Sequence, residues 1–297
     1  MQIITVATHN EGYLDLLKKS CKRNGHKLKI LGWGEGKNWK GNISKFRYLI
    51  DYLKKQDPNE IIMVLDAFDT MVIADSKEIE KKFRDTNKKF ICGAEKINGF
   101  TKKIVEDRFN KLINIPYKKT PLGYDYLCSG TIISYAGYAL KIYQKGLDDN
   151  KGEESDQVAL VKIYLTSNLI DVDWKNEIFF TSNAFNFPKL GHKDFFLPKQ
   201  YEIIYFFKNR IYNKETNSFP VIIHLTGNGD LCKYFAKKLG YKCKEKMFSN
   251  KYYIKKAYYH LKHNKVIMAA IYTLFIILIL SILSGVWFGI KKIKYRK

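Results

Sequence analysis

The sequence predicts an α/β fold, in which a mixed sheet is flanked by helices and followed by one C-terminal transmembrane helix. Two patterns predict the sheet: apolar, strand-like runs alternate with segments whose apolar residues recur at helical spacing. The third observation is a run of 25 uncharged residues at 266–290. As one helix this run would be roughly 37 Å long, enough to cross a hydrocarbon core of about 30 Å.

The strands and helices are expected in alternation along the chain. The predicted strands cover residues 2–8, 27–33, 60–69, 89–95, the first part of 130–147, 176–180 and 219–225. The predicted helices cover residues 12–25, 43–56, 76–86, the second part of 130–147 and 155–165. Each helix has apolar residues that recur on one face, and Ser76 is the expected cap of its helix.

The chain divides by composition into four predicted parts. We expect a globular domain over residues 1–235, a basic helical stalk over 236–265, the membrane helix over 266–290 and a short basic tail over 291–297. The first residues enter an apolar strand with no basic region or cleavage site before it, so no signal peptide is expected. The expected location is therefore a membrane, with a single C-terminal anchor and the globular domain on the cytosolic side.

The charge leaves two interpretations open. The formal net charge is +23, from 52 Lys and Arg against 29 Asp and Glu. Such a balance favours acidic partners such as nucleotide phosphates, anionic lipid or nucleic acid. It is also the surplus of lysine that an AT-rich genome produces, and no specific nucleic acid is expected. The five cysteines are scattered, with no C-x-x-C pair, which argues against a disulfide framework and a zinc site.

Two carboxylates interrupt the apolar stretch "IIMVLDAFDTMVIA", residues 61–74. Asp66 stands at the end of the predicted strand and Asp69 just past it. A buried carboxylate needs a hydrogen-bond donor, a base or a metal ion as partner. If the chain turns at Ala67–Phe68, the two carboxylates converge and offer oxygen ligands to a hard divalent cation. A D-x-x-D pair alone is also compatible with an ordinary surface acidic pair.

A histidine closes another apolar strand in "FPVIIHLTGNGD". His224 there is either a structural strand-end residue or a third ligand beside Asp66 and Asp69. In the second case its nitrogen favours manganese over magnesium.

Two further segments have a structural and a functional interpretation. "GWGEGKNWKGN" holds four glycines and two tryptophans but lacks the G-K-[ST] ending of a phosphate-binding Walker loop. It is a plain surface loop, or a flexible one that closes Trp39 over a base or sugar. In "EESDQVAL", the acids are either a helix cap with charges that complement the helix dipole, or Asp156 faces the acceptor or sugar.

Taken in order, seven segments resemble the glycosyltransferase domain of the procollagen lysyl hydroxylases and its relatives that glycosylate hydroxylysine. They are "TVAT", "LGWGEGKNWKG", "KFRYLIDYL", "VLDAFDTMV", "LCSGTIISYA", "SDQ" and "VIIHLTGNG". The resemblance covers roughly residues 2–235 and implies a GT-A fold, a nucleotide-sugar-binding mixed sheet that uses a UDP-sugar and Mn²⁺. The iron-dependent hydroxylase domains of that family have no counterpart in 297 residues.

The resemblance also implies roles for individual residues. Asp66, Asp69 and His224 match the metal ligands, and Asp156 matches an acidic residue of the sugar–acceptor region, which we take as catalytic. The positions that match the donor site are Thr8, Trp39, Lys45, Phe68, Gly229 and Lys233.

At three positions the chain departs from the family pattern. Phe68 replaces a tyrosine expected to stack on uracil, Cys128 replaces an asparagine, and Thr131 replaces a glycine. The latter two departures leave the sugar as either glucose or galactose.

The sequence therefore predicts a tail-anchored, Mn²⁺-dependent hexosyltransferase of a viral, stand-alone type. Its expected donor is UDP-glucose or UDP-galactose, and its expected acceptor is a hydroxyl group, that of hydroxylysine in a collagen-like protein. The alternatives are a membrane-tethered module that binds nucleotide-sugars or anions without catalysis, and a charge-driven binder of anionic lipid or nucleic acid. Salt-dependent binding without affinity for UDP would favour the last.

Overall fold

The computed structural model describes residues 1–96, 117–149, 155–182, 203–226, 229–242 and Thr273. The chain divides into one compact unit over Met1–Met247 and a second over Phe248–Lys297. Every element below belongs to the first unit.

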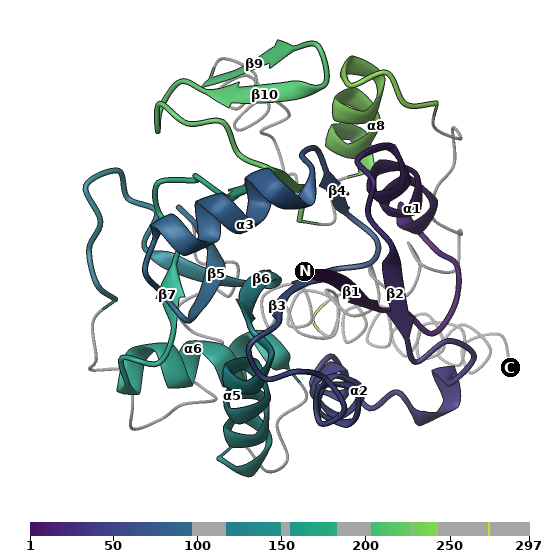
Figure 1. Ribbon diagram of the computed structural model, residues 1–297, viewed down its shortest axis with the longest axis vertical. Coiled ribbons are helices and arrows are strands. Elements are labelled where there is room, and N and C mark those ends of the chain that lie inside the picture. Colours follow the sequence, from purple (N-terminus) through teal and green to yellow (C-terminus); the bar gives the residue numbers. More distant parts are fainter. Residues whose placement is uncertain (97–116, 150–154, 183–202, 227–228, 243–272, 274–297) are drawn as a thin grey trace, which may run out of the picture. The chain divides into compact units, whose positions relative to one another are not determined.

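A six-stranded mixed sheet forms the centre of this unit (Figure 1). Its strands, in spatial order, are β2 (Leu28–Leu31), β1 (Gln2–Val6), β3 (Ile61–Leu65), β6 (Tyr126–Tyr135), β5 (Phe90–Glu95) and β7 (Asp171–Val172). β1 pairs in parallel with β2 and β3, whereas β6 runs antiparallel to β3 and β5. This mixed α/β architecture fits the GT-A fold class.

Helices cover both faces of the sheet. Figure 1 shows α2 (Ser44–Leu53), α5 (Ala136–Asp148) and α6 (Asp156–Thr166) on one face and α1 (Leu14–Arg23) and α3 (Ser76–Asp85) on the other. All five residues of β3 are buried, because a strand alternates its side chains between faces and here both faces are covered. The continuous apolar run before Asp66 is the sequence pattern typical of a strand that is buried on both faces of a sheet.

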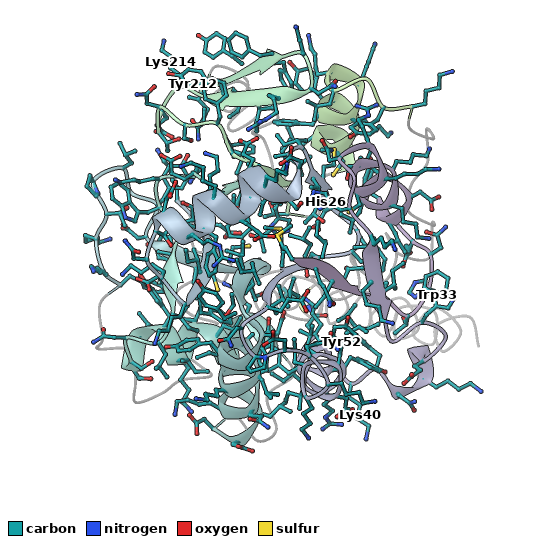
Figure 2. All side chains as sticks on the ribbon, viewed as in Figure 1. His26, Trp33, Lys40, Tyr52, Tyr212 and Lys214 are labelled. Atoms are coloured by element: carbon teal, nitrogen blue, oxygen red, sulfur yellow. The ribbon has the colours of Figure 1, made fainter. Side chains whose placement is uncertain are left out.

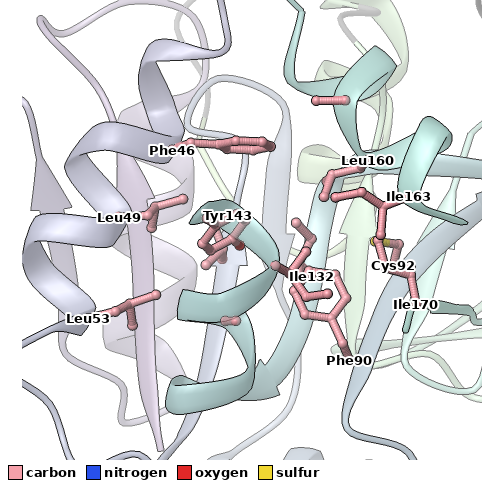
Figure 3. Packing of buried hydrophobic residues seen from close by; sticks show 14 of the residues in the cluster. Phe46, Leu49, Leu53, Phe90, Cys92, Ile132, Tyr143, Leu160, Ile163 and Ile170 are labelled. Carbon is pink, nitrogen blue, oxygen red and sulfur yellow. The ribbon is translucent and has the colours of Figure 1, made fainter. Parts of the chain in front are cut away.

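The two faces have separate hydrophobic cores. Figure 3 shows Phe46, Leu49 and Leu53 of α2 and Tyr143 of α5 gathered in the first core, together with Phe90 and Ile132 from the sheet. The rings of Phe46 and Tyr143 lie 4.9 Å apart. The second core is made by α1, α3 and the alternate residues of β3, namely Leu14, Leu17, Ile79, Phe83, Ile61, Met63 and Leu65.

A second, three-stranded sheet stands beside the carboxyl end of β3. Its order is β4 (Thr70–Val72), β11 (Ile222–His224) and β8 (Phe179–Thr181). β11 runs antiparallel to β4 and parallel to β8, so that His224 is in register with both Thr70 and Thr181. The chain therefore reaches this sheet only five residues after it leaves the central one.

Two elements near the end of the unit complete the described fold. The hairpin of β9 (Ile204–Phe207) and β10 (Arg210–Asn213) packs Phe206 against Phe235 of α8 (Gly229–Lys238), with ring centroids 5.1 Å apart. The predicted domain boundary at residue 235 stays a prediction, and α8 continues three residues beyond it. The cap of α3 is Asp75, which accepts a hydrogen bond from the Glu78 amide, and not Ser76 as the sequence suggested.

The prediction of a transmembrane helix is wrong. Within the residues that the structure describes, no helix is long and apolar enough to cross a membrane. The longest of them, α5, has 13 residues and is about 20 Å long, against the roughly 30 Å of a hydrocarbon core. Apart from Thr273, the predicted span 266–290 lies outside the described residues. The membrane location and the cytosolic topology were deduced from that span, so these predictions are wrong as well.

A buried carboxylate organises the turn that leads into β8. Asp173 accepts hydrogen bonds from the amides of Glu177, Ile178 and Phe179 at 3.1, 2.7 and 2.8 Å. Burial nevertheless outweighs these hydrogen bonds and raises the pKa of Asp173 to about 6. An acid with a raised folded-state pKa stabilises the fold below its unfolded pKa of about 3.9, and this stabilisation is lost as the pH rises through 6.

We therefore expect Asp173 to lower the free energy of unfolding by about 2 kcal/mol between pH 4 and pH 7. Urea unfolding of the wild type and of Asp173→Asn at both pH values measures this, because the difference between the two proteins removes the contribution of other groups. Equal pH dependence in both proteins would contradict the prediction.

Candidate metal centre and donor site

The ends of three strands bring Asp66, Asp69 and His224 together. Asp66 directly follows β3, and its amide donates to the carbonyl of Gly130 at 2.7 Å. The chain then turns, and the turn is held by the hydroxyl of Thr70, which donates to the Asp66 carbonyl at 2.6 Å. Beyond the turn, the carbonyl of Asp69 accepts from the amide of Leu225, the residue after His224. The turn expected at Ala67–Phe68 is thus what allows the two carboxylates to face one histidine.

The three side chains form a compact cluster. His224 Nε2 lies 3.4 Å from Asp69 Oδ1 and 3.9 Å from Asp66 Oδ2, and one potential ligand atom from each residue lies within 4.8 Å of the others. The His224 side chain is 4% exposed and that of Asp69 is 14% exposed. Burial acts to lower the pKa of His224, but the carboxylates of Asp69, Asp66 and Glu95 raise it above its ordinary value.

The donor set fits a divalent cation. Although Nε2 of His224 faces two carboxylates, this buried atom has no hydrogen-bond partner of good geometry among the described residues. A buried polar nitrogen without a partner is costly, and a cation between it and the carboxylates would remove that cost. Two carboxylates with one imidazole match the ligand preferences of Mn²⁺ among the hard divalent ions.

Gly130 leaves room for this cluster. A Cβ added there would lie 2.3 Å from His224 Cε1 and 2.8 Å from Asp66 Oδ2. These distances are shorter than any ordinary contact, so glycine is required wherever both side chains keep their places. The glycine of the "CSG" motif is therefore required for steric reasons.

A buried lysine connects the cluster to Asp156. Lys45 Nζ donates to Asp66 Oδ1 at 2.6 Å and to Asp156 Oδ2 at 2.8 Å. Burial acts to lower the pKa of Lys45, but the two carboxylates raise it, so the lysine stays charged. Burial works against ionisation of Asp66, but Lys45 and His224 lower its pKa. The pKa of the more deeply buried Asp156 is raised by its burial and by the charge of Asp66, despite Lys45.

Asp156 itself is the first residue of α6, and Ser155 caps that helix by accepting from the Val158 amide. The helix cap is therefore Ser155 and not one of the acids. The carboxylate of Asp156 points to Lys45, and its side chain is 4% exposed. Its neighbour Gln157 was missed by the sequence reasoning. The Gln157 side chain accepts from the Ser129 amide at 2.6 Å and donates to the Leu127 carbonyl, which fixes the backbone around Cys128.

Two of the predicted donor residues, Thr8 and Phe68, lie near the end of β1. Thr8 accepts a hydrogen bond from the Gly34 amide at 2.9 Å, which ties the glycine-rich loop to this strand end. The half-buried ring of Phe68 lies 5.9 Å from that of His9. Trp39 packs partly buried against the first core, whereas Trp33 is 52% exposed and stands at the margin in Figure 2.

The other two predicted donor residues lie on α8. Gly229 is the first residue of α8, and Lys233 is exposed one turn further along. Their predicted contact with the diphosphate stays a prediction.

Glu95 is a further acid at the cluster that the sequence reasoning missed. It is the last residue of β5, much as Asp66 directly follows β3, and its carboxylate raises the pKa of His224. Burial raises the pKa of Glu95 to about 7, against the influence of His224 and Cys128, which lower it. An acid at the end of an apolar strand was the signal for Asp66, and the same signal in "FICGAE" could have found Glu95.

Comparison with known proteins decides the family. The model of the PLOD GT domain family matches residues 1–252 of the chain. The chain belongs to this family. Among curated proteins, this PLOD GT domain is 27% identical over 248 residues to the uncharacterized protein R699 of Acanthamoeba polyphaga mimivirus, covering 80% of this chain and 48% of that protein.

Other relatives are animal proteins. The domain is 28% identical over 253 residues to mouse procollagen-lysine,2-oxoglutarate 5-dioxygenase 2, covering 78% of this chain and 30% of that protein. It is 28% identical over 244 residues to the multifunctional procollagen lysine hydroxylase and glycosyltransferase of Caenorhabditis elegans, covering 76% and 30%. The chain thus spans about half the length of the mimivirus protein and about a third of the animal ones.

Two solved glycosyltransferase structures resemble this PLOD GT domain at a low level. One is a glycosyltransferase involved in glycosylation of the major capsid of PBCV-1, with a TM-score of 0.41, 12% identity and coverage of 79% of this chain and 99% of the other. The other is mouse xyloside xylosyltransferase 1, with a TM-score of 0.42, 14% identity and coverage of 77% and 98%. Likeness at this level does not bear on the site.

The two positions expected to depart from the family pattern, Cys128 and Thr131, both lie on β6. The sulfur of Cys128 is 3.3 Å from Nδ1 of His224. Thr131 is fully buried, and its hydroxyl lies 2.4 Å from where a Cβ on Gly93 would stand. Thr131 thus lies in the protein interior, while Cys128 contacts a predicted metal ligand.

Proposed function

We propose that the chain is a divalent-cation-dependent glycosyltransferase that moves a hexose from a UDP-sugar to a hydroxyl group of a protein. The convergence of Asp66, Asp69 and His224 at the end of three strands is the observation on which this rests. Membership of the PLOD GT domain family supports the nucleotide-sugar donor. The names of the animal relatives support hydroxylysine of a collagen-like protein as acceptor.

In this proposal Asp66, Asp69 and His224 hold Mn²⁺. When bound, the cation would act as a Lewis acid toward the diphosphate of the leaving nucleotide. Lys45 keeps Asp66 ionised for ligation through its 2.6 Å ion pair and adds positive charge on the side of the leaving group.

The remaining predicted residues bind and orient the substrates. Phe68 stacks on the uracil, and Thr8 with the loop that contains Trp39 encloses the nucleoside. Gly229 and Lys233 lie toward the diphosphate. Asp156, which Lys45 holds at 2.8 Å, faces the transferred sugar and the acceptor hydroxyl.

Release of UDP tests the proposal. We expect the wild type to release UDP from UDP-glucose or UDP-galactose with Mn²⁺ and not with a chelator. Asp66→Ala should reduce the rate about 100- to 1000-fold, since it removes a ligand of the charge-stabilising cation. Asp85→Ala is the matched control, because Asp85 is a 60% exposed acid on α3.

The same assay separates the alternatives. Equal UDP release by the wild type and Asp66→Ala would contradict the enzyme. Tight UDP binding without turnover, in the presence of hydroxylysine peptides, would instead favour the non-catalytic binding module. Comparison of the two UDP-sugars, and of hydroxylysine with lysine peptides, identifies the donor and the acceptor.

A further inference from the structure

We propose that Cys128 is a positioning residue for His224: its sulfur accepts the hydrogen on Nδ1 of the imidazole and thereby leaves the lone pair of Nε2 directed at the cation site. The inference rests on the proposed metal site but concerns a residue that this chain does not share with the family pattern. The thiol would set both the tautomer and the orientation of the ring.

The contact joins two distant parts of the chain inside the protein. Cys128 lies on β6 and His224 ends β11, 96 positions later, with 3.3 Å between Sγ and Nδ1. The two residues are 5% and 3% exposed, so water does not compete for the contact. The nitrogens of an imidazole point away from each other, so a sulfur beside Nδ1 cannot bind the ion that Nε2 binds. Cys128 therefore acts through the histidine and not as a ligand.

The direction of the hydrogen bond decides whether Nε2 is free to bind a cation. A neutral imidazole has one N–H, and a thiol that donated to Nδ1 would leave that hydrogen on Nε2. Glu95 and Cys128 lie on the paired strands β5 and β6 and influence each other's pKa, so the carboxylate of Glu95 offers the thiol hydrogen another acceptor. This arrangement favours Nδ1–H of His224 as donor to the sulfur.

The arrangement has a known functional counterpart. Histidines that bind metals commonly donate their second N–H to a carboxylate or a carbonyl, which fixes the tautomer and raises the basicity of the ligating nitrogen. Here a thiol takes the place of that acceptor. A buried cysteine is otherwise a small hydrophobic residue, whose role is indifferent to hydrogen bonding. The two roles are distinguishable by substitution.

The test compares three substitutions in the full chain. Cys128→Val keeps the size of the side chain and removes the acceptor, whereas Cys128→Ser keeps an acceptor. Cys21→Val is the matched control, since Cys21 is a 1% exposed cysteine of the second core. We expect Cys128→Val to raise the Mn²⁺ dissociation constant, measured by EPR titration without substrate, by about 10- to 100-fold. Cys128→Ser and Cys21→Val should bind Mn²⁺ much as the wild type does.

A second readout needs no metal and starts from the wild-type protein. ¹⁵N NMR of metal-free protein, at a pH where the imidazole of His224 is neutral, should show the hydrogen on Nδ1. In Cys128→Val the hydrogen should move toward Nε2, where Asp69 is the remaining acceptor. If the valine variant does not fold, Cys128→Ala replaces it, and the wild-type tautomer still tests the inference.

The outcomes separate the inference from the metal site itself. Mn²⁺ binding that depends on Asp66 but is unchanged in Cys128→Val overturns the role of Cys128 alone. A wild-type tautomer with the hydrogen on Nε2 overturns it as well. Mn²⁺ affinity that is equally absent or equally strong in wild type and Asp66→Ala overturns the metal site, and the inference with it.

Discussion

Gly130→Ala is expected to weaken Mn²⁺ binding strongly and to slow the release of UDP with it. The added methyl group would lie 2.3 Å from His224 Cε1, 2.8 Å from Asp66 Oδ2 and 2.9 Å from His224 Nε2. Neither side chain can yield freely, because His224 is in register between β4 and β8 and Asp66 is held by Lys45. One methyl group should therefore separate two ligands and weaken Mn²⁺ binding at least about 100-fold.

Overpacking anywhere in the interior also lowers stability, by about 1–3 kcal/mol. The control is Gly146→Ala on α5, whose added Cβ would lie 2.6 Å from Phe46 Cε2 in the first core. We expect both variants to lose stability in urea unfolding, but only Gly130→Ala to lose Mn²⁺ affinity in an EPR titration. Retention of wild-type affinity by Gly130→Ala would mean that the cluster does not hold the cation.

Lys45→Met is expected to lower the free energy of unfolding by about 3 kcal/mol at pH 7. The lysine is the shared partner of Asp66 and Asp156, and its side chain is 15% exposed, against 4% for Asp156. Its removal leaves a buried carboxylate without a counter-charge, which is more costly than the loss of a surface pair. The pKa of Asp156 is already raised by burial and by Asp66, and without Lys45 it rises further.

The sign of the pH dependence follows. An acid whose folded-state pKa is raised destabilises the fold as the pH rises, so the deficit of Lys45→Met should shrink from pH 7 to pH 4. Adding Asp156→Asn should recover part of the loss at pH 7, since it removes the unpaired charge.

The control for Lys45→Met is Lys81→Met, whose pair with Asp85 is 76% and 60% exposed and worth at most about 0.5 kcal/mol. Urea unfolding at both pH values measures all four proteins. A loss of equal size in Lys45→Met and Lys81→Met would contradict the buried network.

The sequence predicted the parts of the site that depend on local pattern. Asp66 was found because a carboxylate after five buried apolar residues has few structural explanations, and β3 is indeed covered on both faces. The meeting of Asp66 and Asp69 with His224 required that β11 lie beside β4, a pairing between residues 150 or more positions apart. Local pattern contains no information on such a pairing, and the ordered family motifs supplied it.

The contacts that the sequence did not predict are those made across the sheet. Gln157 binds the backbone of β6 from α6, and the contact between Cys128 and His224 depends on the register of two sheets. Trp39 packs partly buried on the first core, while Trp33 six residues earlier is exposed. The expected place of Trp39 over the donor stays a prediction. The transmembrane helix was predicted from the apolarity of residues 266–290 alone. Apolarity indicates that a segment avoids water, but it does not distinguish a membrane from a protein interior.

The central claim is that Asp66, Asp69 and His224 together bind the cation that activates a UDP-sugar. Crystals of the full chain soaked with Mn²⁺ and UDP, and measured at the manganese absorption edge, test it most directly. We expect one anomalous peak within bonding distance of all three side chains, with the diphosphate completing the coordination and the uracil on Phe68. A peak elsewhere, or ordered UDP with no peak between the three residues, would contradict the account.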